Sequence, residues 1–238
     1  MSQVVTANMT GQWSMQGQRD GRVRLKLEPN GSRAWVSTHL ALTQFQGLTA
    51  EQLLSTTSPV NFRLVREAGT FTFSGSFHER AGTGQWRFNA DPAFVSLLRQ
   101  HGYEQPTSEE LYALAVGDVR GSYIADLERA GYQKLPISQL VSLYTNDVSA
   151  EYINSLQSAG YSAISPNELV ALRSNDVSVP YIKSLGDMGY KGLTTAQLIA
   201  LRTNGVTRDF IERLQKGGQK NLSVERLLSL RTNPGIPD

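Results

Sequence analysis

The chain lacks cysteine and has only three histidines, and these absences exclude several classes of functional site. Without a thiol there is no disulfide framework, no cysteine nucleophile, no zinc-finger cage and no iron–sulfur cluster. The histidines, His39, His78 and His101, are 39 and 23 residues apart, which excludes a short metal-binding motif such as HExxH. The sequence also has no phosphate-binding loop and no Gly-rich nucleotide fingerprint. We therefore expect neither a metal site nor a cofactor.

Charge and long apolar runs are also scarce. Charged residues make up 18% of the chain, where soluble domains have roughly 25%. Neither half carries the basic stripe of a nucleic-acid-binding protein, so we expect no nucleic-acid partner. No apolar run approaches the ~18 residues that span a bilayer, and residues 1–16 lack the basic and apolar regions of a signal peptide. We expect a soluble chain without membrane insertion, cytoplasmic if it is full length and extracytoplasmic if it is excised from a membrane sensor.

A 29-residue repeat organises the second half of the chain. Gly-Tyr pairs recur at this spacing from Gly102 to Gly189, and a fifth glycine follows at Gly218. Two columns of leucine run through every unit. They consist of Leu111, Leu140, Leu169, Leu198 and Leu227, and of Leu114, Leu143, Leu172, Leu201 and Leu230.

Each repeat is predicted to form two short helices. Thr107 with Glu110 and Ser165 with Glu168 have the spacing of a capping box, which marks the start of a first helix. Asparagines such as Asn175 are expected to end that helix in the left-handed conformation, and the glycine of the next unit ends the second helix. Helices this short are not stable alone. The pairs must therefore stack, which predicts an α-solenoid.

The first ninety residues have the period of two that is typical of strands. Val23, Leu25 and Leu27 alternate with cations, and Trp86 alternates with polar neighbours. Further strands are expected over 34–42, 61–67, 70–77 and around Trp13, with turns at 20–21, 29–31, 68–69 and 81–84 and a short helix over 49–54. One apolar and one polar face per strand predict an antiparallel sheet. The fold class is therefore α+β, an antiparallel sheet followed by an α-solenoid.

Two domains follow from this change of period. A β domain is predicted over residues 1–90 and a helical repeat domain over 91–238. The helical domain consists of a half-unit (91–101), four full units (102–130, 131–159, 160–188 and 189–217) and a C-terminal half-unit (218–238).

The repeat unit has the pattern Leu-x-x-Leu-Arg-x-Asn-(Asp/Gly)-Val-(Ser/Thr)-x-x-(Tyr/Phe)-Ile-x-x-Leu-x-x-x-Gly-Tyr. It resembles a repeat in the C-terminal extracytoplasmic part of bacterial membrane-anchored sensor metallopeptidases, the antirepressor-type regulators of the β-lactam response, and in related uncharacterised bacterial proteins. The segment from Phe62 to Phe71 is similar to the strand region that precedes the repeats there, so the resemblance covers Asn61 to Arg231. The zinc motif and transmembrane helices of those regulators are absent from this sequence, and their peptidase activity is not carried over. The resemblance implies a bacterial origin and a sensing or scaffolding role in signalling.

Two sets of residues are candidates for a site. Arg173, Arg202 and Arg231 share one column of the repeat and would form a cationic row, either as a solvated face or as a surface that binds an anion or an acidic partner. His78 and His101 are the candidates for a catalytic site. The tyrosines of the Gly-Tyr pairs and the Asn-Asp turns are interpreted as structural.

Three hypotheses of function stay open, and the residues favour a non-enzymatic role over a catalytic one. The first is a protein-interaction, sensing or scaffolding module whose repeats bind a protein, a peptide or a second copy of the chain. The second is a hydrolase with its site in the β domain or at the junction with the repeats, near His78 and His101. The third is a sensor of a small ligand or anion that uses the β domain. A pocket with convergent polar groups would favour the second or the third hypothesis.

Overall fold

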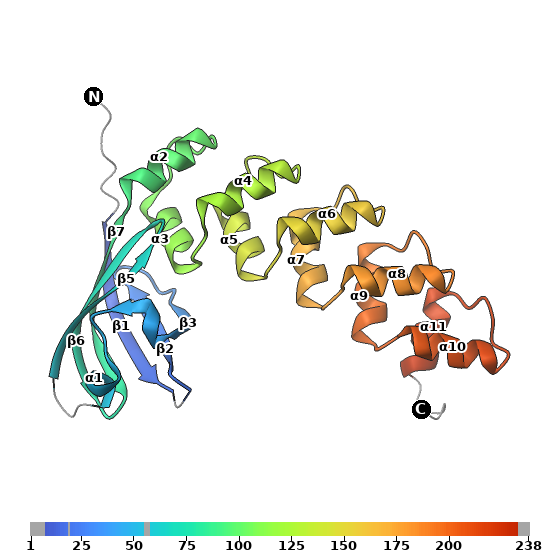
Figure 1. Cartoon of the computed structure of the whole chain (residues 1–238), viewed down its shortest axis with the longest axis horizontal. Coiled ribbons are helices and arrows are strands. Elements are labelled where there is room, and N and C mark those ends of the chain that lie inside the picture. The colour runs from blue at the N-terminus through green and yellow to red at the C-terminus, as the bar shows by residue number, and fades with distance from the viewer. Residues whose placement is uncertain (1–7, 19, 55–57, 233–238) are drawn as a thin grey trace. The chain divides into compact units, whose positions relative to one another are not determined.

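A computed structural model describes residues 8–18, 20–54 and 58–232 of the chain (Figure 1). In these ranges a curled antiparallel sheet of seven strands is followed by a run of ten helices. The strand order is β3-β2-β1-β7-β6-β5-β4. The strands are β1 (Asn8–Gly17), β2 (Arg22–Pro29), β3 (Val36–Ala41), β4 (Phe45–Gln46), β5 (Ser58–Arg66), β6 (Gly69–His78) and β7 (Ala81–Ala90). A single 3-10 turn, η1 (Leu42–Gln44), and a short helix, α1 (Ala50–Leu54), lie between β3 and β5.

The expected strands are all present, and the structure adds one that the sequence did not indicate. Strand β4 has two residues, Phe45 and Gln46, and pairs with Leu64 and Arg63 of β5. Two residues are too few for an alternating pattern to appear in the sequence.

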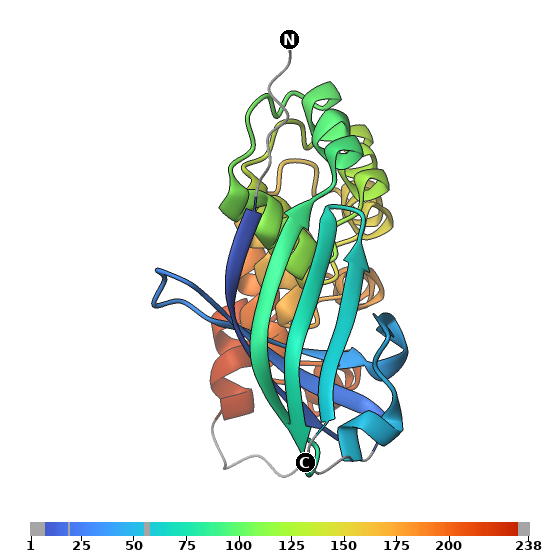
Figure 2. The same ribbon diagram turned by 90° about the vertical axis from the view of Figure 1, so that its left-hand side faces the viewer.

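One face of the sheet is filled with aromatic rings. Trp13 on β1 and Phe62 on β5 are separated by β7 and β6, yet their ring centroids are 5.3 Å apart. In a flat sheet three strand spacings would separate them by about 14 Å, so the sheet curls around this aromatic face. Figure 2 shows β1, β7, β6 and β5 side by side along the curl.

Glycines on the aromatic face make room for the two largest rings. A Cβ atom at Gly75 would lie 2.7 Å from the Trp13 ring, and one at Gly11 would lie 2.6 Å from the Trp86 ring. Each indole therefore lies against the backbone of a nearby strand. The Trp13 indole donates a hydrogen bond to the carbonyl of Ser74 (3.1 Å), so this buried polar group is satisfied.

The prediction of a turn over residues 81–84 is wrong. Gly82 and Gly84 lie inside β7, and a Cβ atom at Gly82 would lie 2.5 Å from the ring of Phe77. The turn is instead made by Glu79 and Arg80, which both have positive φ angles (46° and 71°). Glycine serves close packing against a ring here and not chain reversal, and the local sequence does not distinguish the two uses.

The helices repeat in position with the period of the sequence. Those that open each unit are α3 (Ser108–Val116), α5 (Ile137–Thr145), α7 (Pro166–Ser174), α9 (Thr195–Thr203) and α11 (Val224–Thr232). The second helices are α4 (Gly121–Arg129), α6 (Ala150–Ser158), α8 (Val179–Asp187) and α10 (Arg208–Lys216), and α2 (Pro92–Gln100) precedes the first unit. The predicted capping boxes are confirmed at α3 and α7, and α9 has a third, between Thr194 and Gln197. None of the helices in the described ranges is long and apolar enough to cross a membrane.

The expected left-handed asparagine at the end of each first helix is wrong by one residue. Asn175 has a φ of −100°, and its side-chain amide donates to the carbonyl of Ala171 (2.8 Å). The next residue, Asp176, takes the left-handed conformation with a φ of 55°, and Gly205 does so in the following unit. Asparagine therefore caps the helix with its side chain, while the residue after it reverses the chain.

The chain divides into two compact units, which we describe separately. The first unit comprises residues 1–125 and 136–141, and the second comprises 126–135 and 142–238. Within the first unit, Tyr112 of α3 stacks on Trp86 with ring centroids 5.3 Å apart. Helix α3 therefore covers part of the aromatic face. The first unit contains the whole described sheet, and the second contains α6 to α11.

Candidate functional site

The face of the sheet opposite to the aromatic rings is polar and solvent-exposed. Side chains alternate between the two faces of a strand, so the residues between the aromatic positions point to this side. The strand register aligns them in two rows across four neighbouring strands and β4. The first row is Gln46, Arg63, Thr72, Arg87 and Thr10, and the second row is Asn61, Ser74, Gln85 and Gln12.

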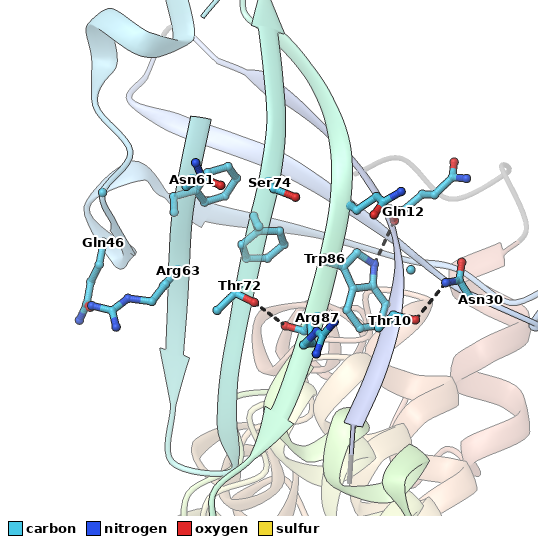
Figure 3. A pocket seen from close by; sticks show the side chains of 15 residues that line it. Thr10, Gln12, Asn30, Gln46, Asn61, Arg63, Thr72, Ser74, Trp86 and Arg87 are labelled. Atoms are coloured by element: carbon cyan, nitrogen blue, oxygen red, sulfur yellow. Dashed lines mark hydrogen bonds between the residues drawn. The ribbon is translucent and has the colours of Figure 1, made fainter. Parts of the chain in front are cut away.

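Differences in side-chain length create a hollow in this face. Thr72 and Ser74 on β6 are short, whereas Arg63 on β5 and Arg87 on β7 stand on either side of them (Figure 3). The result is an open groove of about 720 Å³, which we call the polar groove. It is lined by Thr10, Gly11, Gln12, Asn30, Gln46, Gly47, Asn61, Phe62, Arg63, Thr72, Phe73, Ser74, Gln85, Trp86 and Arg87.

The polar groove has a positive charge and no acidic side chain among its described lining residues. Arg63 and Arg87 both pair with Thr72 across the sheet, so their Cα atoms are two strand spacings, about 10 Å, apart. Both side chains are long enough to reach a group held above Thr72. Two guanidinium groups that line one groove suit a carboxylate, phosphate or sulfate, which arginine binds through paired N–H donors.

Hydrogen bonds hold several groove side chains in place. The Arg63 guanidinium donates to Gln46 (3.1 Å), which keeps it at the β4 side of the groove. At the other side, the Asn30 amide donates to the hydroxyl of Thr10 (3.0 Å). The remaining lining groups are amides and hydroxyls, which act as donors and acceptors at once. Such a lining can bind a ligand that is anionic at one point and rich in hydrogen-bonding groups elsewhere.

The arginines of the repeat column do not line the polar groove and instead contact neighbouring repeats. Arg173 donates through Nε to the carbonyl of Asp147 (3.0 Å), and its guanidinium lies 5.4 Å from the ring centre of Tyr152. Arg202 has the same two contacts with Asp176 (2.9 Å) and Tyr181 (5.3 Å).

The third arginine of the column stacks in the same way. Arg231 lies over Phe210 at 5.3 Å. These arginines therefore connect α7, α9 and α11 to the preceding repeat, and Arg202 also forms an ion pair with the carboxylate of Asp176. Binding of an acidic partner to the row stays a prediction, and such a partner would compete with these contacts.

The structure does not bring the two candidate histidines together. Strand β6 begins beside the start of α2, where the Asp91 amide donates to the carbonyl of Ala68 (3.1 Å), and it ends at His78. A ten-residue strand is about 30 Å long, so His78 lies at the end of β6 that is remote from this junction. His101 follows the last turn of α2. Figure 1 shows α2 at the opposite end of the sheet from the β6–β7 turn.

The sequence contains one signal that indicates the groove. The polar positions of β1, β5, β6 and β7 are occupied by serine, threonine, asparagine, glutamine and arginine, with no carboxylate between Asn61 and Arg66 or between Ala81 and Ala90. The polar positions of these strands form one surface only because the strand order places β1 beside β7. Comparisons with protein-family models, with curated proteins and with solved structures found no match for this chain.

Proposed function

We propose that this chain is a non-enzymatic binding module that holds an anionic ligand in the polar groove. The observation that carries the proposal is that Arg63 and Arg87, which flank Thr72 on the neighbouring strands, line one hollow with no acidic side chain among its described lining residues. The lining groups suit recognition: they offer cations and neutral hydrogen-bonding groups, and the described lining residues include no histidine or carboxylate for proton transfer. This is the third of the hypotheses above, a sensor that uses the β domain.

The helical half would serve as a scaffold in this module. We infer that its units form a solenoid of 29-residue repeats, because equivalent contacts recur from one unit to the next. The Tyr152 hydroxyl donates to the carbonyl of Val177 (2.7 Å), and the Tyr181 hydroxyl donates to that of Val206 (2.9 Å). With the arginine contacts in the opposite direction, the repeat over 160–188 is connected twice to the repeat before it and twice to the repeat after it. A ligand-holding sheet joined to such a scaffold fits the sensing role that the resemblance of the repeats implies.

Anion titration of the whole chain tests the proposal. Inorganic phosphate and galacturonate are added separately at low ionic strength, and binding is followed through the backbone amide resonances of β5, β6 and β7. We expect saturable shifts around Thr72 and Arg87. In the variant Arg63→Gln/Arg87→Gln the affinity falls by about tenfold or more, since charged hydrogen bonds contribute roughly 1.5–3 kcal/mol.

A matched control removes one exposed cation outside the groove. Arg120→Gln, in the loop between α3 and α4, should bind both anions as the wild type does. The proposal is overturned if no anion gives a saturable shift on these strands. It is also overturned if Arg63→Gln/Arg87→Gln and Arg120→Gln bind equally well.

A further inference from the structure

The polar groove continues into two smaller hollows on the same face of the sheet. The first, of about 340 Å³, shares Gln12 and Gln85 with the polar groove. It also shares Ser14 and Thr83 with the second, of about 450 Å³. We call the three together the trough. Because neighbouring hollows have lining residues in common, one extended molecule can pass through all three.

Strand register explains how the trough crosses the sheet. Ser76 on β6 pairs with Thr83 on β7, and Thr83 pairs with Ser14 on β1, so short hydroxyl side chains are adjacent on three strands. Ser14 then pairs with Lys26 on β2. From β5 to β3 the path crosses five strand spacings, about 24 Å, which exceeds the size of a single small anion.

Cations lie at both ends of the trough. Arg63 and Arg87 line one end, while Arg24 and Lys26 line the hollow at the other. The Arg24 guanidinium donates to the Ser37 hydroxyl (3.2 Å) and is exposed. Among the described residues that line the trough, one carboxylate is present, that of Glu28, and it forms an ion pair with Lys26.

An exposed indole ring marks the second end. Trp35 is 57% exposed, and the ammonium group of Lys26 lies 4.9 Å from its ring centre. The other two tryptophans of the chain, Trp13 and Trp86, are buried on the opposite face of the sheet at 2% exposure each. An aromatic ring left in solvent beside a cation offers a flat surface on which an apolar ring face can stack.

We propose that the trough binds an acidic oligosaccharide that runs from the polar groove to Trp35. The sugar hydroxyls form hydrogen bonds with the amides and hydroxyls that line the trough. The carboxylates of the oligosaccharide form ion pairs with the arginines and Lys26 at the two ends, and one sugar ring stacks on Trp35. The inference rests on the proposed anion site at Arg63 and Arg87 and adds the class and length of its ligand.

Other extended anions fit this surface less well. A sequence-tolerant single-stranded nucleic acid is held by several aromatic side chains on which successive bases stack. The described outer face of the sheet offers only Trp35 for this purpose. A peptide would find few apolar side chains to pack against, since the outward-facing lining is rich in hydroxyls and amides such as those of Ser14, Thr72 and Gln85.

The test compares ligands by length and charge on the whole chain. Titration calorimetry at low ionic strength uses a galacturonate hexasaccharide, monomeric galacturonate, a neutral galactose oligosaccharide of the same length, and oligothymidylate. We expect the acidic hexasaccharide to bind at least about tenfold more tightly than the monomer and the neutral oligosaccharide. In Trp35→Ala the affinity for the hexasaccharide falls by about tenfold, and Trp35→Phe restores part of it. Leu54→Ala, which removes another exposed apolar side chain outside the trough, should bind as the wild type does.

The outcomes separate this inference from the proposed function. If the monomer binds through Arg63 and Arg87 but the hexasaccharide binds no more tightly and Trp35→Ala has no effect, the inference is overturned and the anion site stands. If oligothymidylate binds more tightly than the hexasaccharide, the ligand is a nucleic acid and the inference is also overturned. If neither acidic sugar binds, both proposals fail.

Discussion

The sheet and the helical repeats bury their apolar side chains in different ways. In the sheet, rings from strands that are not neighbours meet: the Phe62 and Phe73 rings stack at 4.7 Å, and Trp13 reaches both. In the helical repeats, leucines such as Leu172 and Leu201 are fully buried between helices that are close in sequence. The polar face opposite to the rings is available for ligands because the rings occupy only one side of the sheet.

The two kinds of packing predict different ranges for the structural effect of a single substitution. A ring that spans several strands couples segments that are distant in the sequence, so its loss should affect the sheet as a whole. In the helical half α9 packs against α7 and α11, the equivalent helices of the adjoining repeats, so a defect in α9 should stay local. The predictions below test this contrast, starting with the largest expected effect.

Removing a central ring should destabilise the sheet most strongly. Trp13→Ala deletes a side chain that is 2% exposed and contacts Phe62, Phe73 and Phe77. We expect a loss of about 3–5 kcal/mol in the free energy of unfolding of the sheet, measured by chemical denaturation. Hydrogen exchange should accelerate in all the central strands. The control Trp35→Ala, at an exposed position, should cost less than about 1 kcal/mol, and equal losses in the two variants would contradict the role given to Trp13.

Replacing a leucine in the repeats should lower the free energy of unfolding less than Trp13→Ala does, and the effect should be limited to neighbouring helices. Leu201 on α9 is fully buried, and α9 packs against α7 and α11. Leu201→Ala is expected to lose about 2–5 kcal/mol, with faster hydrogen exchange confined to these three helices. Ile199→Ala, on the half-buried side of the same helix, should have a smaller effect. Accelerated exchange throughout α6 to α11 would show that the repeats unfold as one unit.

The leucine columns and helix caps could be predicted because they depend on residues close in sequence. The spacing of Leu172 and Leu201 by one repeat indicated one buried column, and Ser165 with Glu168 indicated a helix start. The structure bears out both, with Leu172 and Leu201 buried and a capping box at α7.

The groove and the arginine contacts could not be predicted because they depend on distant residues. Arg87 and Thr10 share a row only because β1 pairs with β7, which are far apart in the sequence. Arg202 contacts the backbone of Asp176, 26 residues earlier, and no local pattern distinguishes this from a solvated arginine. The turn expected at Gly82 is wrong for a different reason: Phe77 is only five residues earlier, but the close approach of its ring to Gly82 follows from the strand register and not from residue type.

Removing a tyrosine hydroxyl should change the free energy of unfolding differently in the two compact units. The Tyr181 hydroxyl bonds the Val206 carbonyl, and burial raises the pKa of Tyr181 to about 12, opposed by the nearby Arg202. Tyr112 stacks on Trp86, and its buried hydroxyl has no hydrogen-bond partner among the described residues. Tyr181→Phe should lose about 1 kcal/mol, because the Val206 carbonyl is left unpaired, whereas Tyr112→Phe should be neutral or stabilising. A larger loss in Tyr112→Phe than in Tyr181→Phe, measured by urea denaturation, would contradict this assignment.

The smallest expected effect is a dependence of repeat stability on pH through Glu168. Its carboxylate accepts hydrogen bonds from the Ser165 hydroxyl (2.7 Å), from the Thr195 hydroxyl (2.7 Å) and from the Ser165 backbone amide (3.0 Å). These bonds, the Ser165 hydroxyl first, lower the pKa of Glu168 from 4.5 to about 2.

Because the folded-state pKa is depressed, the carboxylate stabilises the fold fully above pH 4.5, and this contribution is lost as the pH falls towards 2. Urea denaturation across this range should therefore show the wild type losing stability relative to Glu168→Gln, which cannot titrate. Replacing the donors in Ser165→Ala/Thr195→Val should return the pKa towards its usual value and move the loss to higher pH. Parallel pH profiles for the wild type and Glu168→Gln would mean that the three hydrogen bonds to this carboxylate, two from Ser165 in its own repeat and one from Thr195 in the next, do not favour its charged form in the folded state.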